Sequence, residues 1–527
     1  MYDILVKNGT LVDGTGNPRR KADIAIKDGK IIAVGQLNEA EAVRVIDATG
    51  KIVAPGFIDA HSHTDATVEI NPFFESTIRQ GITTEVVGNC GDSAAPISAL
   101  SGGGFGGFMQ TPKDHEMTLG EYMDCLETKG MSANIAWLVG HNTLRAIAGI
   151  RGKEYTQEQF HIMEELLRQA MEDGALGMSS GLEFDPGRMS EPEELLHLTS
   201  VLKPYDGIYT SHIRNRDAKV LDALAEYLNV IETNKLRGEV SHMNIRHNTH
   251  APENALERCV QMIQQARDSG LDVLTDMTPL NYGIGSMAGI LPTWLTSEPK
   301  EKLRSLLLDP QTREKLRRDC DRYWRFIAGG EWERVRMQNN IAIPEINGLT
   351  FLEISKLWNK DPWDCYFDIL AANAPEIGSV VLVSYLFTDE HLRETISNSL
   401  YMLVVDGYST SADGEIAKAT QFPLHYIGMA WFLTKHVREL HTLELEEAIR
   451  KMTSMPAQHF RLGKRGLIIE DYVADICIFD FEKLETPFDL SNPCQYTKGM
   501  DYVIVAGVMV LDEGRHLHTT PGRCLRR

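Results

Sequence analysis

The sequence contains no apolar run close to the ~20 residues that a membrane-spanning helix requires, so we expect no membrane partner. Residues 1–9 do not place a basic stretch before an apolar one, and we therefore expect no signal peptide. The eight cysteines are scattered along 527 residues, a distribution that does not form a disulfide framework. We expect a reducing, cytoplasmic location, where a cysteine with a special role is a metal ligand or a nucleophile.

Positively charged residues are also scarce. The chain has 53 Lys and Arg against 74 Asp and Glu, which gives a formal net charge of -21. A surface this acidic repels a phosphate backbone, so we expect no nucleic-acid partner. With 43% hydrophobic and 24% charged residues the composition is typical of a globular protein, and the length predicts a large domain with a smaller one attached.

The two ends of the chain resemble each other. Residues 3–14 and 501–514 are both β-rich and punctuated by Gly and Asp, and Ala-Asp-Ile-Ala-Ile at 22–26 is echoed by residues 474–478. The simplest interpretation is one small β-sandwich domain assembled from residues 1–54 and 463–527. It would flank a central domain.

The central residues 55–462 alternate apolar β-type runs with longer helical patterns such as 156–173, 216–233 and 252–268. Eight runs end near Ala60, Gly88, Gly140, Ser180, Ser211, Ser241, Asp276 and Val405. Eight parallel strands with crossover helices are what an α/β fold of the (β/α)8 TIM-like barrel type requires, and this is the fold class we predict. An open doubly wound sheet is the alternative, but the Gly-rich nucleotide fingerprint of such sheets does not follow the first run.

The connection after the seventh run is unusually long. It covers about residues 280–395 and contains several helical stretches, among them 299–307 and one that starts at Asp361-Pro362. We interpret it as an α-rich insertion beside the barrel mouth. After the second run, the Gly-rich stretch 102–107 lacks the Lys-Ser/Thr of a phosphate loop and predicts a mobile loop near the site.

Residue types that bind metals gather at the predicted strand ends, where barrel enzymes carry their active sites. His61 and His63 follow the first run, and their spacing of two makes both side chains point the same way. Cys90 follows the second run, His212 the fifth and His242 the sixth. Alone, a buried cysteine is mostly a small hydrophobic residue, and a single histidine is unremarkable. Together, these N and S donors at one barrel mouth suit zinc.

The eighth run ends in Asp406-Gly407. A carboxylate opposite a metal cluster can take a proton from the attacking water, which is the arrangement that hydrolytic metal sites need. The structural alternative is an Asp that caps a turn before glycine. The position at a strand end favours catalysis.

These motifs resemble a known family. Gly-Phe-Ile-Asp-Ala-His-Ser-His at 56–63 looks like the first-strand signature of the amidohydrolase superfamily, and Val-Val-Gly-Asn-Cys-Gly at 86–91 resembles its D-aminoacylase, or N-acyl-D-amino-acid deacylase, branch. Residues 139–145, 180–187 and 521–527 are similar as well, so the resemblance covers nearly the whole chain in order. It implies a hydrolase of amide bonds other than peptide bonds that acts on a small-molecule N-acyl compound.

The resemblance also implies the metal ligands. Cys90, His212 and His242 would hold one zinc ion tightly. His61 and His63 would form a second, weaker position that shares the Cys90 thiolate.

Two further roles follow from the resemblance. Many relatives bridge two metals with a modified lysine at the end of the fourth strand, but this chain has Ser-Ser-Gly at 179–181, so Cys90 would supply the bridging anion. Asp406 would deprotonate the attacking water and then protonate the leaving amine.

The substrate pocket is where the chain departs from the family. D-aminoacylases hold the α-carboxylate of the substrate with a Tyr, a Lys and an Arg, whereas this chain has Phe184, Asn244 and Ala417 at or beside these places. These departures predict that simple N-acetyl-D-amino acids are poor substrates and that amides without the α-carboxylate are better ones. Three cations nearby in the sequence are candidates to substitute: Arg214, Arg246 and Lys418.

Two other hypotheses stay open. A cyclic-amide hydrolase of the dihydroorotase or hydantoinase kind uses the same scaffold, although the missing fourth-strand lysine and the Gly-Asn-Cys-Gly motif speak against it. A non-catalytic barrel used as an oligomeric scaffold should have lost its ligands, whereas this chain keeps five and the aspartate. A homo-oligomer is compatible with all three hypotheses.

Overall fold

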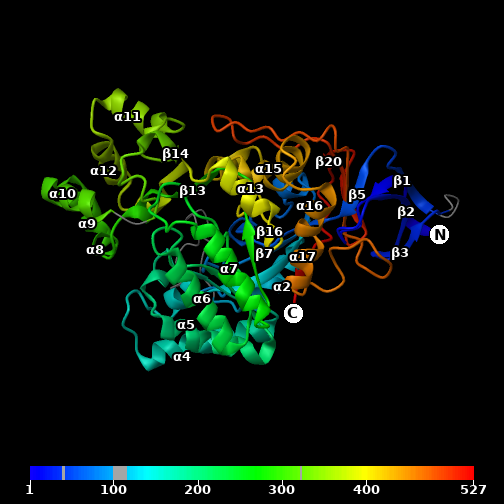
Figure 1. Cartoon of the computed structure of the whole chain (residues 1–527), viewed down its shortest axis with the longest axis horizontal. Coiled ribbons are helices and arrows are strands. Elements are labelled where there is room, and N and C mark those ends of the chain that lie inside the picture. Colours follow the sequence, from blue (N-terminus) through cyan, green and yellow to red (C-terminus); the bar gives the residue numbers. More distant parts are fainter. Residues whose placement is uncertain (38–41, 99–115, 321–322) are drawn as a thin grey trace.

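The computed structural model describes residues 1–37, 42–98, 116–320 and 323–527. In Figure 1 a sheet built from both chain ends lies at the right, the barrel in the middle and a projecting insertion at the left. The Gly-rich stretch 102–107, which we predicted as a mobile loop, lies outside the described residues. None of the described helices has the length and apolar character needed to cross a membrane.

The central sheet contains all eight predicted strands, and the predicted barrel class is confirmed. The strands are β6 (Phe57–Asp59), β7 (Ile82–Val87), β8 (Asn134–Gly140), β9 (Gly177–Gly181), β10 (Ile208–His212), β11 (Arg237–Val240), β12 (Val273–Met277) and β16 (Tyr401–Leu403). They pair in parallel in chain order, from β6 through β12 to β16. Every residue in them is buried, as expected for a parallel sheet that is covered on both faces.

The barrel closes through backbone just beyond β6 and β16. Asp406 N donates to His61 O at 2.9 Å, and His63 N donates to Gly407 O at 2.8 Å. Ser62 and Gly407 form an isolated parallel bridge between the same two segments. Closure therefore fixes the candidate site residues of the first and last strands against each other.

Amphipathic helices cover the barrel, and α4 (Gln157–Asp173) shows why they form. Thr156 and Gln159 form a capping box at its start, and Gly174 ends it with a left-handed φ of 110°. Its buried residues recur at helical spacing on one face, including Phe160, Met163 and Leu167. The other α-helices that the structure describes outside the insertion are α1 (Glu75–Ile78), α2 (Leu119–Lys129), α3 (His141–Ile147), α5 (Pro192–Thr199), α6 (Val220–Asn234), α7 (Ala255–Asp268), α13 (Asp389–Ser397), α14 (Gly414–Ala419), α15 (Leu424–Trp431), α16 (Leu445–Met452) and α17 (Ser454–His459).

The two chain ends share a second sheet, as predicted. Its strands are β1 (Tyr2–Leu11), β2 (Arg20–Lys27), β3 (Lys30–Gly35), β4 (Ala42–Asp47), β5 (Ile52–Pro55), β17 (Ile476–Phe479), β18 (Met500–Val505), β19 (Val508–Asp512) and β20 (Arg515–His516). Hydrogen bonds join them into one continuous sheet, in which β1 pairs with β4 along its first half and with β5 along its second. This branching lets the sheet enclose an apolar core of its own, with Val6, Ile24 and Ile476 fully buried. The short β21 (Cys524–Leu525) returns to pair with β8.

The insertion between β12 and α13 contains the expected helices and a sheet that we did not predict. The helices are α8 (Thr293–Thr296), α9 (Lys300–Leu308), α10 (Pro310–Asp319), α11 (Phe351–Trp358) and α12 (Pro362–Asn373). At the predicted start of α12, the Asp361 side chain accepts a hydrogen bond from Trp363 N at 2.9 Å. The small antiparallel sheet has the order β13 (Tyr282–Ser286), β15 (Val381–Tyr385), β14 (Val335–Asn339). Its pairings join segments far apart in the sequence, which leave no local signal.

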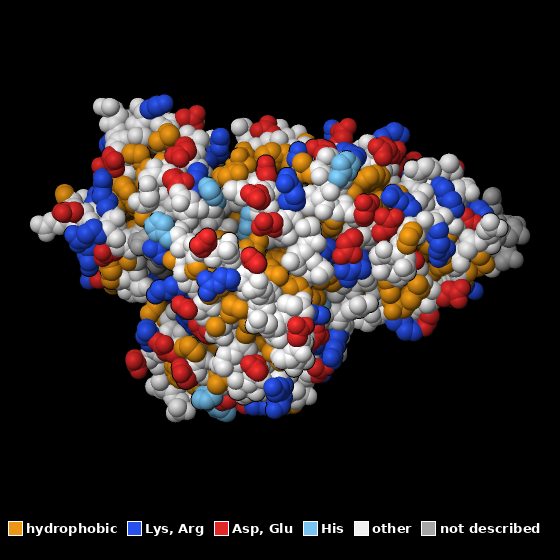
Figure 2. Space-filling model, in the orientation of Figure 1, with side chains coloured by type: hydrophobic (Ala, Val, Ile, Leu, Met, Phe, Trp, Pro, Cys, Tyr) orange, Lys and Arg blue, Asp and Glu red, His pale blue; other side chains and the backbone are white. Residues whose placement is uncertain are grey.

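Acidic and basic side chains are interspersed over the face of the molecule seen in Figure 2.

Candidate metal centre

Three candidate residues stand in tight turns directly after their strands. Cys90, His242 and Asp406 have left-handed φ angles of 52°, 37° and 56°. Such backbone costs energy in residues other than glycine and persists where the surroundings impose it. Around Cys90 the turn also uses Gly88, where an added Cβ would lie 2.0 Å from Leu138 O. The strained backbone at these three residues thus directs their side chains into the barrel mouth.

Cys90 lies at the centre of the cluster. Its Sγ is 3.3 Å from Nε2 of His61, 3.3 Å from Nε2 of His242 and 3.6 Å from Nδ1 of His212. In a tetrahedral site with Zn–S of about 2.3 Å and Zn–N of about 2.0 Å, sulfur and nitrogen ligands stand about 3.5 Å apart. The side chains of Cys90, His212 and His242 therefore fit a single zinc ion, and their ligand atoms all lie within 4.8 Å of one another.

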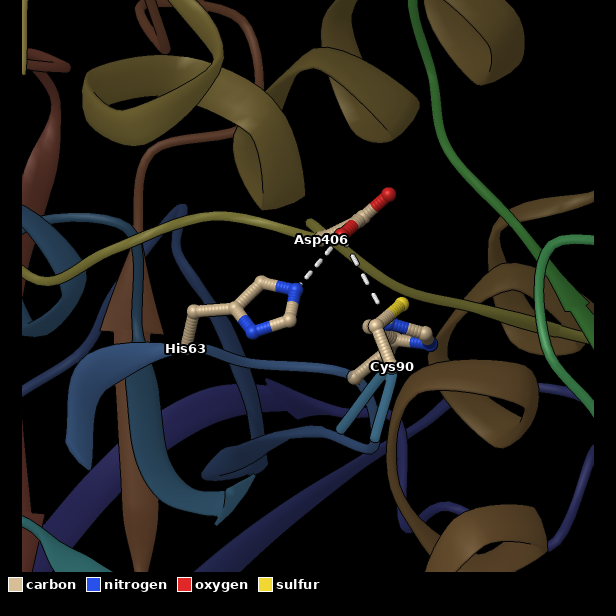
Figure 3. A group of neighbouring side chains, drawn as sticks. His63, Cys90 and Asp406 are labelled. Atoms are coloured by element: carbon tan, nitrogen blue, oxygen red, sulfur yellow. Dashed lines mark hydrogen bonds and ion pairs between the residues drawn. The ribbon is translucent and has the colours of Figure 1, made fainter. Parts of the chain in front are cut away.

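A second donor set shares the Cys90 sulfur. Oδ1 of Asp406 is 3.2 Å from Nε2 of His63 and 3.5 Å from Nε2 of His61. Figure 3 shows Asp406 and His63 facing each other, with Cys90 beside the carboxylate. The structure thus brings together the six side chains that the sequence placed at strand ends: His61, His63, Cys90, His212, His242 and Asp406.

Two carboxylates orient the histidine rings from behind. Oδ2 of Asp276 lies 3.0 Å from Nδ1 of His61, and Oε2 of Glu183 lies 2.7 Å from Nε2 of His212. A carboxylate accepts hydrogen bonds, so it holds the proton on the nitrogen that faces it and leaves the other nitrogen of the ring free for a metal. In both rings that free nitrogen faces Cys90.

Sequence reasoning missed both of these carboxylates. Asp276 is the next-to-last residue of the seventh strand, so the rule that found the ligands at the other strand ends would have found it as well. Glu183 lies two residues after β9, in a motif quoted above only for its resemblance to the family.

The ionisation of the cluster favours a bound cation. Burial raises the pKa of the Cys90 thiol, but the charge of His61 and a hydrogen bond from His212 outweigh burial and hold this pKa well below its usual range. Burial also raises the pKa of Asp406, but His61 and His63 hold it below its ordinary value. The pKa of His63 is lowered by burial, yet Asp406 and Cys90 raise it to about 10. A thiolate and a carboxylate side by side thus require positive charge, which protons or a metal ion can supply.

The chain matches known proteins along its whole length. A model of the Amidohydrolase family matches residues 44–306 and 420–511. An N-acyl-D-glutamate deacylase from Alcaligenes xylosoxydans xylosoxydans is 30% identical over 531 residues, which cover 100% of this chain and 96% of the relative. A D-aminoacylase from the same organism is 26% identical, with 100% of this chain and 98% of the relative covered. This chain belongs to the D-aminoacylase family of amidohydrolases.

A solved structure agrees with this membership. An N-acyl-D-glutamate deacylase from Bordetella bronchiseptica, complexed with zinc and a phosphonate inhibitor, matches with a TM-score of 0.82 and 27% identity over 100% of both chains. The protein is therefore a metal-dependent amidohydrolase that acts on C–N bonds other than peptide bonds, as predicted.

Two adjoining cavities lie in front of the cluster of this D-aminoacylase-family protein. The inner one has a volume of about 70 Å³, and four of the ligand residues line it together with Phe184, Tyr323 and Tyr408: His63, Cys90, His212 and His242. The outer one has a volume of about 720 Å³ and shares these three aromatic residues with the inner one. Much of its wall comes from the insertion, and its volume suits a small-molecule ligand.

The four predicted substrate residues divide into two pairs. Phe184 and Asn244 line the inner cavity, as expected. Placing Arg214 in the pocket was wrong, because Glu226 on α6 accepts hydrogen bonds from its Nε at 2.9 Å and its Nη2 at 2.7 Å. Placing Lys418 there was also wrong, because it is an exposed residue whose Nζ is 2.5 Å from Glu415.

The third candidate cation is buried but already paired. Arg246 donates to both carboxylate oxygens of Glu183 and, at 3.0 Å, to Oδ2 of Asp217. Its guanidinium also lies 4.6 Å from the centre of the Tyr323 ring. It supports the wall of the cavity and is not among the residues that line it.

The residues of the inner cavity that were not predicted include Arg216 and Tyr323. Arg216 follows Arg214 by two residues in the loop after β10, and the sequence offers no means of telling which of the two faces inward. Tyr323 comes from the insertion, where nothing in the local pattern marks a cavity residue.

Proposed function

We propose that this protein is a zinc-dependent deacylase that hydrolyses the amide bond of a small N-acyl compound. The observation that carries the proposal is the group of three imidazole nitrogens that lie 3.3 to 3.6 Å from the Cys90 sulfur, with the Asp406 carboxylate beside them. One thiolate with imidazole donors suits zinc. Two relatives that match the whole chain are named for the removal of acyl groups from amines, which supports the proposed reaction.

In this proposal Cys90, His212 and His242 hold one zinc ion tightly. His61 and His63 form a second, weaker position that shares the thiolate, for which the 3.3 Å between His61 Nε2 and Cys90 Sγ is the support. When bound, zinc polarises the scissile carbonyl and lowers the pKa of a coordinated water toward ~7.

Asp406 moves the proton in this proposal. Its side chain is 28% exposed, whereas those of His61 and His242 are 0% and 3% exposed, so the carboxylate reaches the cavity. Neighbouring positive charge lowers the pKa of Asp406, so its carboxylate is ionised at neutral pH and can take the proton of the attacking water. A carboxyl with a low pKa is a strong acid once protonated, so passing that proton to the leaving nitrogen is favourable.

The end of the fourth strand bears on the cyclic-amide alternative. Ser179 Oγ accepts a hydrogen bond from Gly91 N at 3.0 Å, and Ser180 Oγ lies 2.7 Å from the Tyr209 hydroxyl and 2.8 Å from Ser211 Oγ. No lysine is among the described residues that line the inner cavity. A bridging lysine thus has no counterpart in the part of the cavity that the structure describes, and the Cys90 sulfur occupies the central position.

The deciding experiment measures zinc content and amine release on the same preparation. We expect bound zinc, release of free amines from a panel of N-acetyl amines and N-acetyl amino acids, and loss of both activity and metal on dialysis against a chelator. Hydantoin and dihydroorotate serve as cyclic controls. Full activity without metal would refute the zinc-dependent mechanism, and ring opening without deacylation would favour the cyclic-amide hypothesis.

A further inference from the structure

Another cavity lies away from the metal cluster, where the end of α1 meets the sheet built from both chain ends. Its volume is about 490 Å³, which is within the range of small-molecule sites. Its walls come from Arg79 at the end of α1, from the loop between β17 and β18, and from β18, β19 and the turn after β19. It shares no lining residue with the two cavities at the barrel mouth.

The charged residues of this cavity are both cations. Arg79 and Lys498 line it, and no Asp or Glu is among the described residues that do so. The wall thus differs from the chain as a whole, whose formal net charge is -21. Lys498 Nζ lies 3.5 Å from Oε2 of Glu485, but the two side chains are 71% and 66% exposed. A surface ion pair of this kind contributes little, so Lys498 is available to attract another anion.

Arg79 is held in place but has no anion to bind. Its guanidinium lies over the ring of Tyr496, 4.7 Å from the ring centre, and Nη1 donates to Gly514 O at 3.0 Å. None of the described residues forms an ion pair with Arg79, and none accepts a hydrogen bond from Nη2. A guanidinium that is positioned in advance and keeps free donors is a suitable anchor for a carboxylate.

The rest of the wall offers a fixed apolar surface. Met500 and Leu511 line the cavity from β18 and β19, and both are buried. The Tyr496 hydroxyl donates to Oε2 of Glu75 and accepts from Ala412 N, each at 2.7 Å. These two bonds fix the Tyr496 ring. A planar apolar group can therefore pack against this wall without first ordering a mobile side chain, which lowers the entropic cost of binding.

We propose that this cavity is a second ligand site, which binds a small organic acid with a planar apolar body. Arg79 binds the carboxylate, Lys498 adds attraction from the rim, and the apolar body packs against Tyr496 and Met500. A neutral molecule of the same shape gains the apolar contacts but not the attraction of the two cations. The site lies outside the metal centre, so the inference goes beyond the proposed deacylase function and its test requires no turnover.

The test compares two probes of nearly the same shape on the zinc-loaded full-length enzyme. The acid is para-fluorobenzoate, and para-fluorobenzamide is its neutral counterpart. Fluorine NMR titration measures both affinities. We expect the acid to bind with a dissociation constant in the millimolar range or below, and at least about tenfold more tightly than the amide, the worth of one charge-assisted hydrogen bond. Arg79→Gln should abolish this preference, and Arg79→Lys should keep part of it.

Two variants serve as controls. Lys483→Gln removes a cation from the same loop that does not line the cavity, with a side chain 82% exposed and Nζ 3.0 Å from Asp480. Cys90→Ser removes the thiolate of the metal cluster. Both should keep the wild-type preference for the acid, because neither residue is part of this cavity. Melting temperature and zinc content are measured for every variant.

Four results would overturn the proposal. They are the absence of binding of para-fluorobenzoate at millimolar concentration, equal affinity of the wild type for the two probes, a preference that survives in Arg79→Gln, and a preference that is lost in Cys90→Ser. The last result would place the acid at the metal cluster.

A crystal of the wild-type enzyme soaked in para-iodobenzoate locates the acid without any substitution, so the test also holds if Arg79→Gln does not fold. We expect the anomalous signal of iodine in this cavity, with the carboxylate of the probe at the Arg79 guanidinium. Iodine at the metal cluster and none in this cavity would contradict the proposal.

Discussion

Glu183 accepts a hydrogen bond from Nε2 of His212 at 2.7 Å, which leaves Nδ1 of that ring facing the Cys90 sulfur. Replacing Glu183 by Gln removes the charge that holds this tautomer in place. We expect zinc affinity to fall by roughly tenfold to a hundredfold, as is usual when the carboxylate behind a metal-binding histidine is lost. Competition with a chelator of known affinity measures the change. Glu226→Gln, which alters a carboxylate outside the cavity, should leave the affinity unchanged.

The Cys90→Ser variant should lose most of its zinc and its activity, because the thiolate is the donor common to both ligand sets. A barrel with a core of this extent does not depend on the ion to fold, so circular dichroism should remain that of the wild type. Cys259→Ser is the control: this thiol is also buried, and burial raises its pKa to about 12. Zinc retained in full by Cys90→Ser would remove Cys90 from the metal site.

The Asp406→Asn variant should bind zinc but turn over at least about a hundred times more slowly, the usual scale of general acid–base catalysis. Single-turnover amine release on metal-loaded protein measures this. Asp413→Asn, an exposed residue later in the same segment, should behave as the wild type. If Asp406→Asn turns over at a near-normal rate, Asp406 is not the catalytic base and serves only as a turn residue at the barrel seam.

Lys451 on α16 is fully buried, and its Nζ donates to the carbonyls of Ile396 and Asn398 at 2.5 Å each. Burial lowers its pKa from 10.5 to about 7. Between these pH values the unfolded chain binds more protons than the folded protein, so the free energy of unfolding increases with pH. Below pH 7 both states are protonated, and the cost of burying the charge is constant.

Relative to Lys451→Met, the wild type should therefore gain stability from about pH 7 to pH 10, by an amount on the order of a few kcal/mol. Denaturant unfolding at a series of pH values measures the difference. Lys435→Met, which alters a surface lysine paired with Glu439, should keep the wild-type slope. The same slope in wild type and Lys451→Met would show that Lys451 stays charged in the folded protein throughout.

Sequence reasoning succeeded where a rule of geometry connects residues far apart. Side chains of a strand alternate, and the carboxyl ends of parallel strands meet at one rim, so His61 and His242 could be placed together although 181 positions separate them in the numbering. Sequence reasoning failed where the orientation of a side chain depends on a neighbouring residue that no geometric rule identifies. Arg214 and Arg216 are alike in sequence, and Glu226 on the next helix determines which of them turns away from the cavity.

The seam of the barrel is also the floor of the site, since Asp406 N donates to His61 O and His63 N donates to Gly407 O. A single residue inserted between Asp59 and His61 would shift this pairing and turn both imidazoles to the opposite face of the chain. The cavity walls come largely from the insertion, so their sequence can change without disturbing the metal ligands. The backbone pairing at the seam cannot change in this way. New substrate preferences should arise in the insertion and the strand-end loops, with the seam unaltered.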